Sequence, residues 1–420
     1  MSEPPSADIA LSRFSKILYL LLAISVGIES AFFLTEIPFL MRASGISLEN
    51  VGWYSAAATL PYILQSFFNP ITEFAMRRRS WFVIISTCCA LSILFSLKCL
   101  SSHHQYLFYA AAMIGQILYG LACSCYSGLA ATTLNSSGRL QASNLLSLGA
   151  QAGGAFGSTV FLAVTQRCSL GMLALLLLAL IVLPALAALA IYEPKAGPQR
   201  PEILVGAIAD EARQVMRNKE SWLGLALCAC PAGTLALNYF LPALAIDYHA
   251  PSWMTISLNG YAGWMITLAG IYIGGLACRR VYYPVVYMSS AVLMALTGLL
   301  FALMPVQAVS YAIGSVIYSA VQGASVAACS AMIFDLISQS KSSSSTQYSI
   351  FYGASSLAQM YVLSINTHVY GRHGLTALYT TDAALNLLGV VMLLVLMRRW
   401  LGKRKLFLAK TQVIARGCDV

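Results

Sequence analysis

Residues 169–192 read SLGMLALLLLALIVLPALAALAIY, a run without a charged side chain. A helix of about twenty apolar residues crosses the roughly 30 Å hydrocarbon core of a bilayer, so this run is long enough to span a membrane. The whole chain has the same character, because 59% of its 420 residues are hydrophobic, 10% are charged and the mean hydropathy is +0.74. Soluble domains carry about a quarter charged residues. The composition therefore predicts a membrane protein and excludes a soluble enzyme, a secreted domain and a nucleic-acid-binding protein.

Twelve apolar segments lie along the chain, six on each side of a longer polar interval. The segments lie near 17–41, 51–75, 81–101, 105–131, 142–166 and 169–192, and then near 221–247, 254–278, 282–304, 306–337, 346–370 and 375–398. We predict an all-α membrane protein with twelve transmembrane helices. Its parts are an N-terminal tail (1–16), a six-helix half (17–192), an inter-domain loop (193–220), a second half (221–398) and a basic tail (399–420). The first segment is longer than the apolar core of a signal peptide, so we expect it to stay in the protein.

The positive charges indicate the orientation in the membrane. If both termini are cytoplasmic, all but four of the 25 lysines and arginines fall in cytoplasmic segments, the exceptions being Arg42, Lys98, Arg167 and Arg372. Cytoplasmic loops of membrane proteins are enriched in Lys and Arg, and a missed helix would invert every later loop. The net charge of +10 is thus explained by insertion in the cytoplasmic (inner) membrane, without a nucleic-acid partner.

The two halves share weak sequence similarity. Pro38 is followed about forty residues later by Arg77–Arg79, and Pro242 is followed at a similar spacing by Arg279 and Arg280. Because an even number of spans precedes the second half, both halves insert in the same direction. Parallel six-helix repeats around a central cavity are the architecture of the major facilitator fold, which we predict for this chain.

Glycines indicate close helix packing in both halves. Small residues spaced four apart let the backbones of two membrane helices approach each other. We expect such contacts where the halves meet, at the following positions: Gly149, Gly153, Gly154, Gly157, Gly270, Gly274 and Gly275.

The junction of the second and third segments carries a recognisable motif. It reads Leu60-Pro61-Tyr62, then Phe67-Phe68-Asn69-Pro70-Ile71-Thr72-Glu73, then Arg77-Arg78-Arg79-Ser80-Trp81. This region resembles the muropeptide-permease (AmpG-like) branch of the major facilitators, which also contains siderophore-uptake permeases and the eukaryotic acetyl-CoA transporter. The resemblance covers about residues 20–85 and implies a transporter of a medium-sized solute. The family usually has an aspartate where this chain has Glu73, and the loop that follows is shorter in this chain than in the family.

The charges of this junction suggest a gate. Glu73 lies at the cytoplasmic end of the second segment, and Arg77, Arg78 and Arg79 follow it. Such groups can bridge neighbouring helix ends in one conformation and separate in the other, with about 1 kcal/mol or less for each solvated link. The alternative is that the three arginines only hold the loop in the cytoplasm.

Glu29 is the first candidate for proton coupling. Charged side chains inside a bilayer are costly and mark functional positions, and Glu29 lies near the middle of the first segment. Ser25, Glu29, Phe32 and Glu36 follow helical spacing and are expected on one stripe facing a wet cavity. Burial disfavours the charged form of a carboxylate, so Glu29 can bind and release a proton; alternatively it is a permanently neutral structural group. Glu36 and Asp247 are expected near the outer ends of their segments, where water can reach them. Asp382 lies in the outer part of the last segment, usually a peripheral helix, and is a weaker candidate.

Neutral polar side chains form stripes on several segments and predict a substrate lining. Amides and phenols form hydrogen bonds without a fixed charge, although any single one can instead join two helices. The candidates for substrate binding are Ser25, Gln116, Tyr119, Gln151, Asn238, Tyr239, Tyr318, Gln322, Gln359 and Tyr361.

The function that follows is secondary active transport. The middle of the spans contains no Arg or Lys, so the sequence favours an amphipathic, hydrogen-bonding solute over a strongly anionic one. We predict proton-coupled uptake of a siderophore-like molecule by a monomer in the lipid bilayer, with muropeptide transport and drug efflux as alternatives. An enzyme or a receptor is the alternative of a different class. Cys123 and Cys125 point in different directions on a helix, as do Cys228 and Cys230, so we expect neither a metal site nor a cofactor.

Overall fold

The computed structural model describes residues 13–64, 76–102, 104–134, 136–165, 170–193, 213, 219–338 and 344–401, and these contain helices and no strand. We number the transmembrane spans 1 to 12 in chain order. In the first half, span 1 is α1 (Arg13–Ala31), the π-helix η1 (Phe32–Glu36) and α2 (Ile37–Ala43), and span 2 contains α3 (Leu48–Ala58) and α4 (Leu60–Ile63). Spans 3 to 6 are α6 (Arg78–Ser101), α7 (Gln105–Thr133), α8 (Ser136–Thr165), and α9 (Leu170–Ala185) with η3 (Leu186–Ala190).

The second half has the same succession of spans. Span 7 is α11 (Lys219–Cys228), η4 (Ala236–Tyr239) and α12 (Leu241–Asp247), and span 8 is α13 (Ser252–Asn259) with α14 (Tyr261–Arg280). Spans 9 and 10 are α15 (Tyr283–Leu303) and α16 (Ala308–Ser338), and α17 (Ser344–Leu401) contains spans 11 and 12. The predicted twelve-helix fold is confirmed. Most of the predicted loop 193–220, and nearly all of both tails, lie outside the described residues.

A glycine separates the last two spans. Gly374 has φ +77°, the one residue inside α17 with a non-helical backbone. Such a conformation is readily adopted by glycine and costs other residues energy. The chain therefore reverses direction between spans 11 and 12 without a loop, as the short interval in the sequence predicts.

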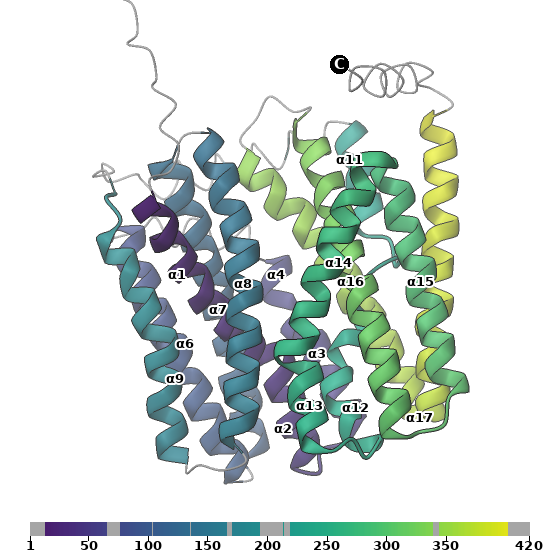
Figure 1. Cartoon of the computed structure of the whole chain (residues 1–420), viewed down its shortest axis with the longest axis horizontal. Coiled ribbons are helices and arrows are strands. Elements are labelled where there is room, and N and C mark those ends of the chain that lie inside the picture. The colour runs from purple at the N-terminus through teal and green to yellow at the C-terminus, as the bar shows by residue number, and fades with distance from the viewer. Residues whose placement is uncertain are drawn as a thin grey trace, which may run out of the picture.

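The two halves are arranged with twofold pseudosymmetry. In Figure 1, α1, α6, α7, α8 and α9 form one bundle beside a second bundle that contains α14, α15, α16 and α17. Between the halves, α2 contacts α12, α3 and α4 contact α17, and α8 contacts α13 and α14. These are the span pairs 1–7, 2–11 and 5–8. If each span is replaced by its counterpart in the other half, span 2 becomes span 8 and span 11 becomes span 5. The pair 2–11 then becomes the observed pair 8–5, so the contacts fit parallel six-helix halves.

Glycines bring helix backbones together mainly within each half. A Cβ atom at Gly153 would collide with the backbone of Ile24 in α1, and one at Gly274 would lie 2.6 Å from Cα of Ala324 in α16. Gly154 is different, because it packs against Trp264 of α14 in the other half. The expectation of close packing is confirmed, although only Gly154 among these examples lies where the halves meet.

Neighbouring glycines of α14 provide a matched test of this packing. We expect Gly274→Ala to lower the free energy of unfolding by about 1–3 kcal/mol, because the added methyl group forces α14 away from α16. Gly275 has no atom within 4 Å of its virtual Cβ, so Gly275→Ala should change stability by less than about 1 kcal/mol. Thermal unfolding of both variants in the same detergent measures the difference, and equal midpoints would contradict the packing argument.

An ion pair joins the halves at one end of the bundle, which we call the Arg42 end. Arg42, in α2, contacts the Asp247 carboxylate at the end of α12, and its Nη1 atom donates to Ile46 O over 3.3 Å. The Arg42 and Asp247 side chains are 24% and 17% exposed. Tyr248 directly follows Asp247, and its hydroxyl lies 3.0 Å from that of Tyr379 in span 12. The Arg42 end, at the bottom of Figure 1, is therefore closed by contacts between spans 1 and 7.

Loss of this ion pair should loosen the Arg42 end. We expect Asp247→Asn to destabilise the closed arrangement by about 1 kcal/mol or less, since the pair is partly solvated. Spin labels on the exposed residues Ser44 and His249, in a background without other labelled cysteines, should then give a longer, broader distance distribution. The swapped pair Arg42→Asp/Asp247→Arg should restore the original distribution; an unchanged distribution in Asp247→Asn would refute the role.

Candidate functional site

Four tyrosines from both halves gather where spans 2, 4, 7 and 11 meet, and we call Tyr62, Tyr119, Tyr239 and Tyr352 the tyrosine cluster. The ring of Tyr62, in α4, lies edge to face with Tyr119 of α7 at 5.6 Å and with Tyr352 of α17 at 6.3 Å between centroids. Tyr239 of η4 lies near the Tyr62 hydroxyl. The cluster thus combines two rings from each half.

Neutral polar groups surround the cluster. The Tyr239 hydroxyl lies beside the Gln359 side chain of span 11. The Tyr119 hydroxyl lies beside Ser30 of α1 and Cys123 of its own helix. Aromatic rings provide apolar area, and phenol, amide and hydroxyl groups provide directed hydrogen bonds. The arrangement can therefore hold an amphipathic solute between the halves without pairing a charge.

Three predicted binding residues lie in this site, and a fourth is adjacent. Tyr119, Tyr239 and Gln359 face the cluster. Gln116 precedes Tyr119 by one turn of α7, is fully buried, and neither atom of its side-chain amide has a hydrogen-bond partner. A buried amide without a partner is costly, and its spacing from Tyr119 places both residues on one face of α7.

Other predicted binding residues hold helices together within one half. The Ser25 hydroxyl donates to Ile181 O of α9 over 2.8 Å, and the Tyr361 hydroxyl donates to Ala229 O over 2.8 Å. Asn238 adjoins Tyr318 of α16, whose hydroxyl lies near the backbone of η4.

The two remaining predicted glutamines lie on different helices. Gln151 lies one turn from Gly154 on α8, near the contact with α14, and its Oε1 atom is buried without a partner. Gln322 is half-buried beside Gly323, where α16 packs on α14 within the second half.

Glu29 is fully buried inside the first half. Ser86 and Cys89 of α6 lie beside it, yet neither carboxyl oxygen forms a hydrogen bond of normal geometry. The Cys123 thiol lies beside the Tyr119 hydroxyl and within electrostatic reach of the Glu29 carboxyl group. Glu29 therefore adjoins the tyrosine cluster through Cys123 instead of facing the gap between the halves directly.

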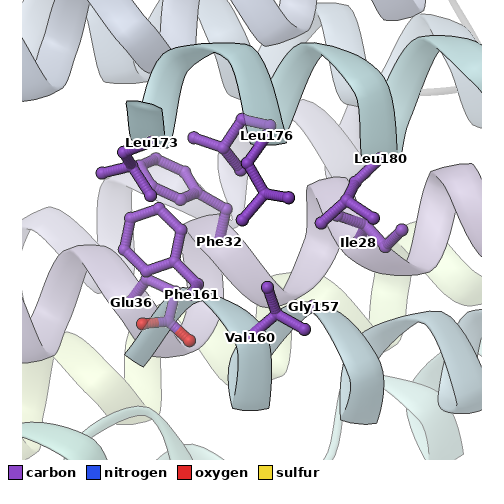
Figure 2. A pocket seen from close by; sticks show the side chains of 10 residues that line it. Ile28, Phe32, Glu36, Gly157, Val160, Phe161, Leu173, Leu176 and Leu180 are labelled. Atoms are coloured by element: carbon purple, nitrogen blue, oxygen red, sulfur yellow. The ribbon is translucent and has the colours of Figure 1, made fainter. Parts of the chain in front are cut away.

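Glu36 lies in an apolar crevice between span 1, α8 and α9. Figure 2 shows its carboxyl group at the edge of a group of apolar side chains that includes Phe32, Phe161 and Leu173. Its side chain is fully buried, so the expectation that water reaches Glu36 was wrong. Phe32 and Phe161 pack edge to face at 5.0 Å, and the crevice is a packing feature of the first half.

Span 7 is interrupted between α11 and η4, and side chains replace its helical hydrogen bonds. Gly233 and Leu235 have positive φ angles of 64° and 61°. Tyr361 donates to Ala229 O, Tyr287 donates to Ala232 O over 2.5 Å, and Asn386 Oδ1 accepts from Gly233 N over 2.9 Å. The interruption positions η4, and with it Tyr239, against the tyrosine cluster.

Asp382 lies behind this interruption and is fully buried. Its Oδ1 atom accepts from Asn366 Nδ2 over 2.8 Å, and its Oδ2 atom accepts from Asn386 Nδ2 over 3.2 Å. Asn386 is also the residue that holds Gly233. The sequence ranks Asp382 low because span 12 is usually peripheral. In the structure Asp382 joins spans 11 and 12, and Asn386 extends this network to Gly233 of span 7.

The predicted gate lies partly outside the described residues. Glu73 belongs to the part of span 2 that the structure does not describe. The backbone N–H groups of Arg78 and Arg79 each donate to the Glu193 carboxylate over 3.2 Å. The Arg78 side chain also donates to Gly128 O over 2.6 Å, so in this conformation these arginines join the ends of spans 3, 4 and 6. Arg77 caps α6 with an extended backbone.

Two residues of the site, Tyr62 and Tyr352, are absent from the predicted binding residues. Tyr62 belongs to the motif of span 2. Tyr352 precedes Gln359 by seven residues, which places both on the same face of span 11. This spacing is the signal that would have found it.

Comparisons with known proteins agree with the fold. No curated protein resembles the chain closely enough in sequence to count as a relative. The solved D-xylose–proton symporter superposes with a TM-score of 0.68 at 14% identity, covering 91% of this chain and 96% of that one. The nucleoside transporter NupG gives 0.67 at 12% identity, with coverages of 92% and 99%. The human organic anion transporter MFSD10 (TETRAN) gives 0.59 at 17% identity, with coverages of 93% and 100%.

The family follows from a sequence model in addition to these folds. The model of the Major Facilitator Superfamily matches residues 18–362, which include the spans that form the tyrosine cluster and the interruption of span 7. Members of this superfamily are membrane transporters and not enzymes. The chain belongs to the Major Facilitator Superfamily.

Proposed function

We propose that the protein is a secondary active transporter that takes up an amphipathic, hydrogen-bonding small molecule together with protons. The tyrosine cluster carries this proposal. It lies where the halves meet, its rings come from both halves, and its polar neighbours are neutral. Rocking of the halves around such a site would expose it to one side of the membrane at a time, as in alternating access.

The chemistry of the cluster favours a solute with rings and hydroxyl or amide groups. We propose a siderophore-like substrate, in keeping with the resemblance of residues 20–85 to the muropeptide-permease and siderophore-uptake branch. Muropeptide transport and drug efflux are the alternatives. The D-xylose–proton symporter and the nucleoside transporter, which share the fold, carry polar ring compounds, and this supports a hydrogen-bonding cargo.

Glu29 is the proposed proton-binding residue. Its carboxyl group is buried without a cation beside it among the described residues, and its oxygens lack normal hydrogen bonds, an environment that favours the neutral acid. Access of water in another conformation would favour proton release. Cys123 links Glu29 to Tyr119, so a change of charge at Glu29 would be felt at the tyrosine cluster.

We propose that the protein lies in the inner membrane with both termini in the cytoplasm. The Arg42 end then faces outward. The distribution of Lys and Arg supports this orientation. The ion pair of Arg42 and Asp247 then closes the outer side. Glu73 and Arg77–Arg79 would form the cytoplasmic gate, and a monomer suffices because each half contributes to one site.

The substrate class can be tested through Gln359. Thermal unfolding of the purified protein should shift upward with ferric siderophores and stay unchanged with muropeptides or cationic drugs, because ligand binding to the folded state raises its stability. We expect Gln359→Ala to raise the Kd about 5–15-fold, the effect of one lost hydrogen bond. Gln322→Ala is the control. A shift with muropeptides alone would reassign the substrate.

Proton coupling can be tested through Glu29. In proteoliposomes with an imposed pH gradient, we expect Glu29→Gln to abolish accumulation of the substrate above equilibrium while exchange of internal and external substrate continues, because the amide binds no proton. Glu36→Gln, which removes an equally buried carboxyl group of the same span, should keep gradient-driven accumulation. Uptake by Glu29→Gln that still followed the pH gradient would defeat this assignment.

A further inference from the structure

We propose that the second half binds a sodium ion at Asp382, with the Asp382 carboxylate, Asn366 Oδ1 and Tyr318 Oη as ligands behind the interruption of span 7. All three side chains are fully buried, with exposed fractions of 0%. They come from three different spans, 12, 11 and 10. This inference is independent of the transported solute and of Glu29, which lies in the other half.

The geometry brings these oxygen atoms together. Asn366 Nδ2 donates to Asp382 Oδ1 over 2.8 Å, so the oxygen of the same amide, Asn366 Oδ1, lies close to the carboxylate. The Tyr318 hydroxyl faces the backbone of Leu237 and Asn238 and lies within electrostatic reach of Asp382. Neither Asn366 Oδ1 nor Tyr318 Oη has a hydrogen-bond partner. Buried polar atoms without partners are uncommon in proteins and call for an explanation.

The hydrogen bonds of Asp382 suit its ionised form. Each carboxylate oxygen accepts from an asparagine amide, Asn366 on one side and Asn386 on the other. Glu29 and Glu36 differ, because their oxygens accept no such bond. A proton on Asp382 would leave Asn366 Oδ1 unpaired. A cation bound beside Asp382 would provide a partner for Asn366 Oδ1 and Tyr318 Oη and would also neutralise the buried charge.

The oxygen set fits sodium better than a divalent ion. Hard cations prefer oxygen ligands, and Ca²⁺ sites combine several carboxylates. Among the described residues of this site, Asp382 is the sole carboxylate, and His, Cys, Asp and Glu form no cluster of three or more anywhere in the described part of the chain. One negative charge with neutral oxygens matches a monovalent cation, and interrupted membrane helices are typical positions for coupling ions.

The proposed ion would stabilise the interruption of span 7. Asn386 holds Asp382 with its amide nitrogen and Gly233 with its amide oxygen. Tyr318 adjoins the backbone of Leu237 and Asn238 in η4. The next residue, Tyr239, belongs to the tyrosine cluster. An ion at Asp382 would therefore fix the position of Tyr239.

The test is thermal unfolding of the purified full-length protein, without substrate, in NaCl or choline chloride at equal ionic strength. We expect saturating Na⁺ to raise the unfolding midpoint by about 2–4 °C. Asp382→Asn should abolish the rise, and Tyr318→Phe should increase the half-saturating Na⁺ concentration about tenfold or more. Glu36→Gln, an equally buried carboxyl group in the other half, should keep the rise.

Binding of ²²Na⁺ to the wild-type protein provides a second measurement that does not depend on the folding of any variant. One ion bound per chain, displaced by excess NaCl but not by choline chloride, is the expected result. Identical midpoints in the two salts together with no retained ²²Na⁺ would overturn the proposal. A midpoint that changes with pH but not with Na⁺ would also overturn it, and loss of that pH dependence in Asp382→Asn would assign Asp382 to proton binding.

Discussion

The bilayer supplies no hydrogen bonds to a polypeptide backbone, and every part of this structure must meet that constraint. The described residues meet it almost entirely with helices. At the interruption of span 7 the helix is lost, and the side chains of Tyr287, Tyr361 and Asn386 bind the backbone groups instead. A broken helix in lipid is tolerated only where other protein groups satisfy it, so spans 9, 11 and 12 have to pack around the break.

This packing explains why the two halves carry their polar residues differently. In the first half, close contacts such as Gly153 against Ile24 bring α8 onto α1, and Glu29 remains among neutral neighbours. In the second half, the Asp382 carboxylate accepts hydrogen bonds from the Asn366 and Asn386 amides beside the interruption of span 7. The pseudosymmetric halves thus share helix order and contacts but not chemistry.

The sequence predicted the fold because its signals are additive along the chain. The apolar segments and the bias of Lys and Arg each depend on local composition. The site was harder, because helical spacing reveals a shared face but not its direction. Ser25, Glu29 and Glu36 all point into the first half, but Ser25 meets α9, Glu29 meets α6, and Glu36 faces the crevice between span 1, α8 and α9. The π-helix η1 lies between Glu29 and Glu36 and changes the helical spacing there. The position of Asp382 beside the interruption of span 7 could not be predicted, because the interruption itself has no clear sequence signal. It depends on positive φ angles at Gly233 and Leu235, and leucine rarely adopts them.

The tyrosine cluster connects these features into one device. Its members lie on different elements. Tyr119 lies beside Cys123 on α7, near Glu29, and Tyr239 belongs to η4, next to the interruption of span 7. Tyr352 belongs to span 11 and packs on Tyr62. A solute between the halves would contact rings whose positions depend on both. Motion of one half against the other must then either keep the ring contacts or exchange them for contacts with the solute. Because edge-to-face rings give only about 0.5–1.5 kcal/mol per pair beyond burial, a bound solute can replace them, and the same rings that pack the halves together can release them.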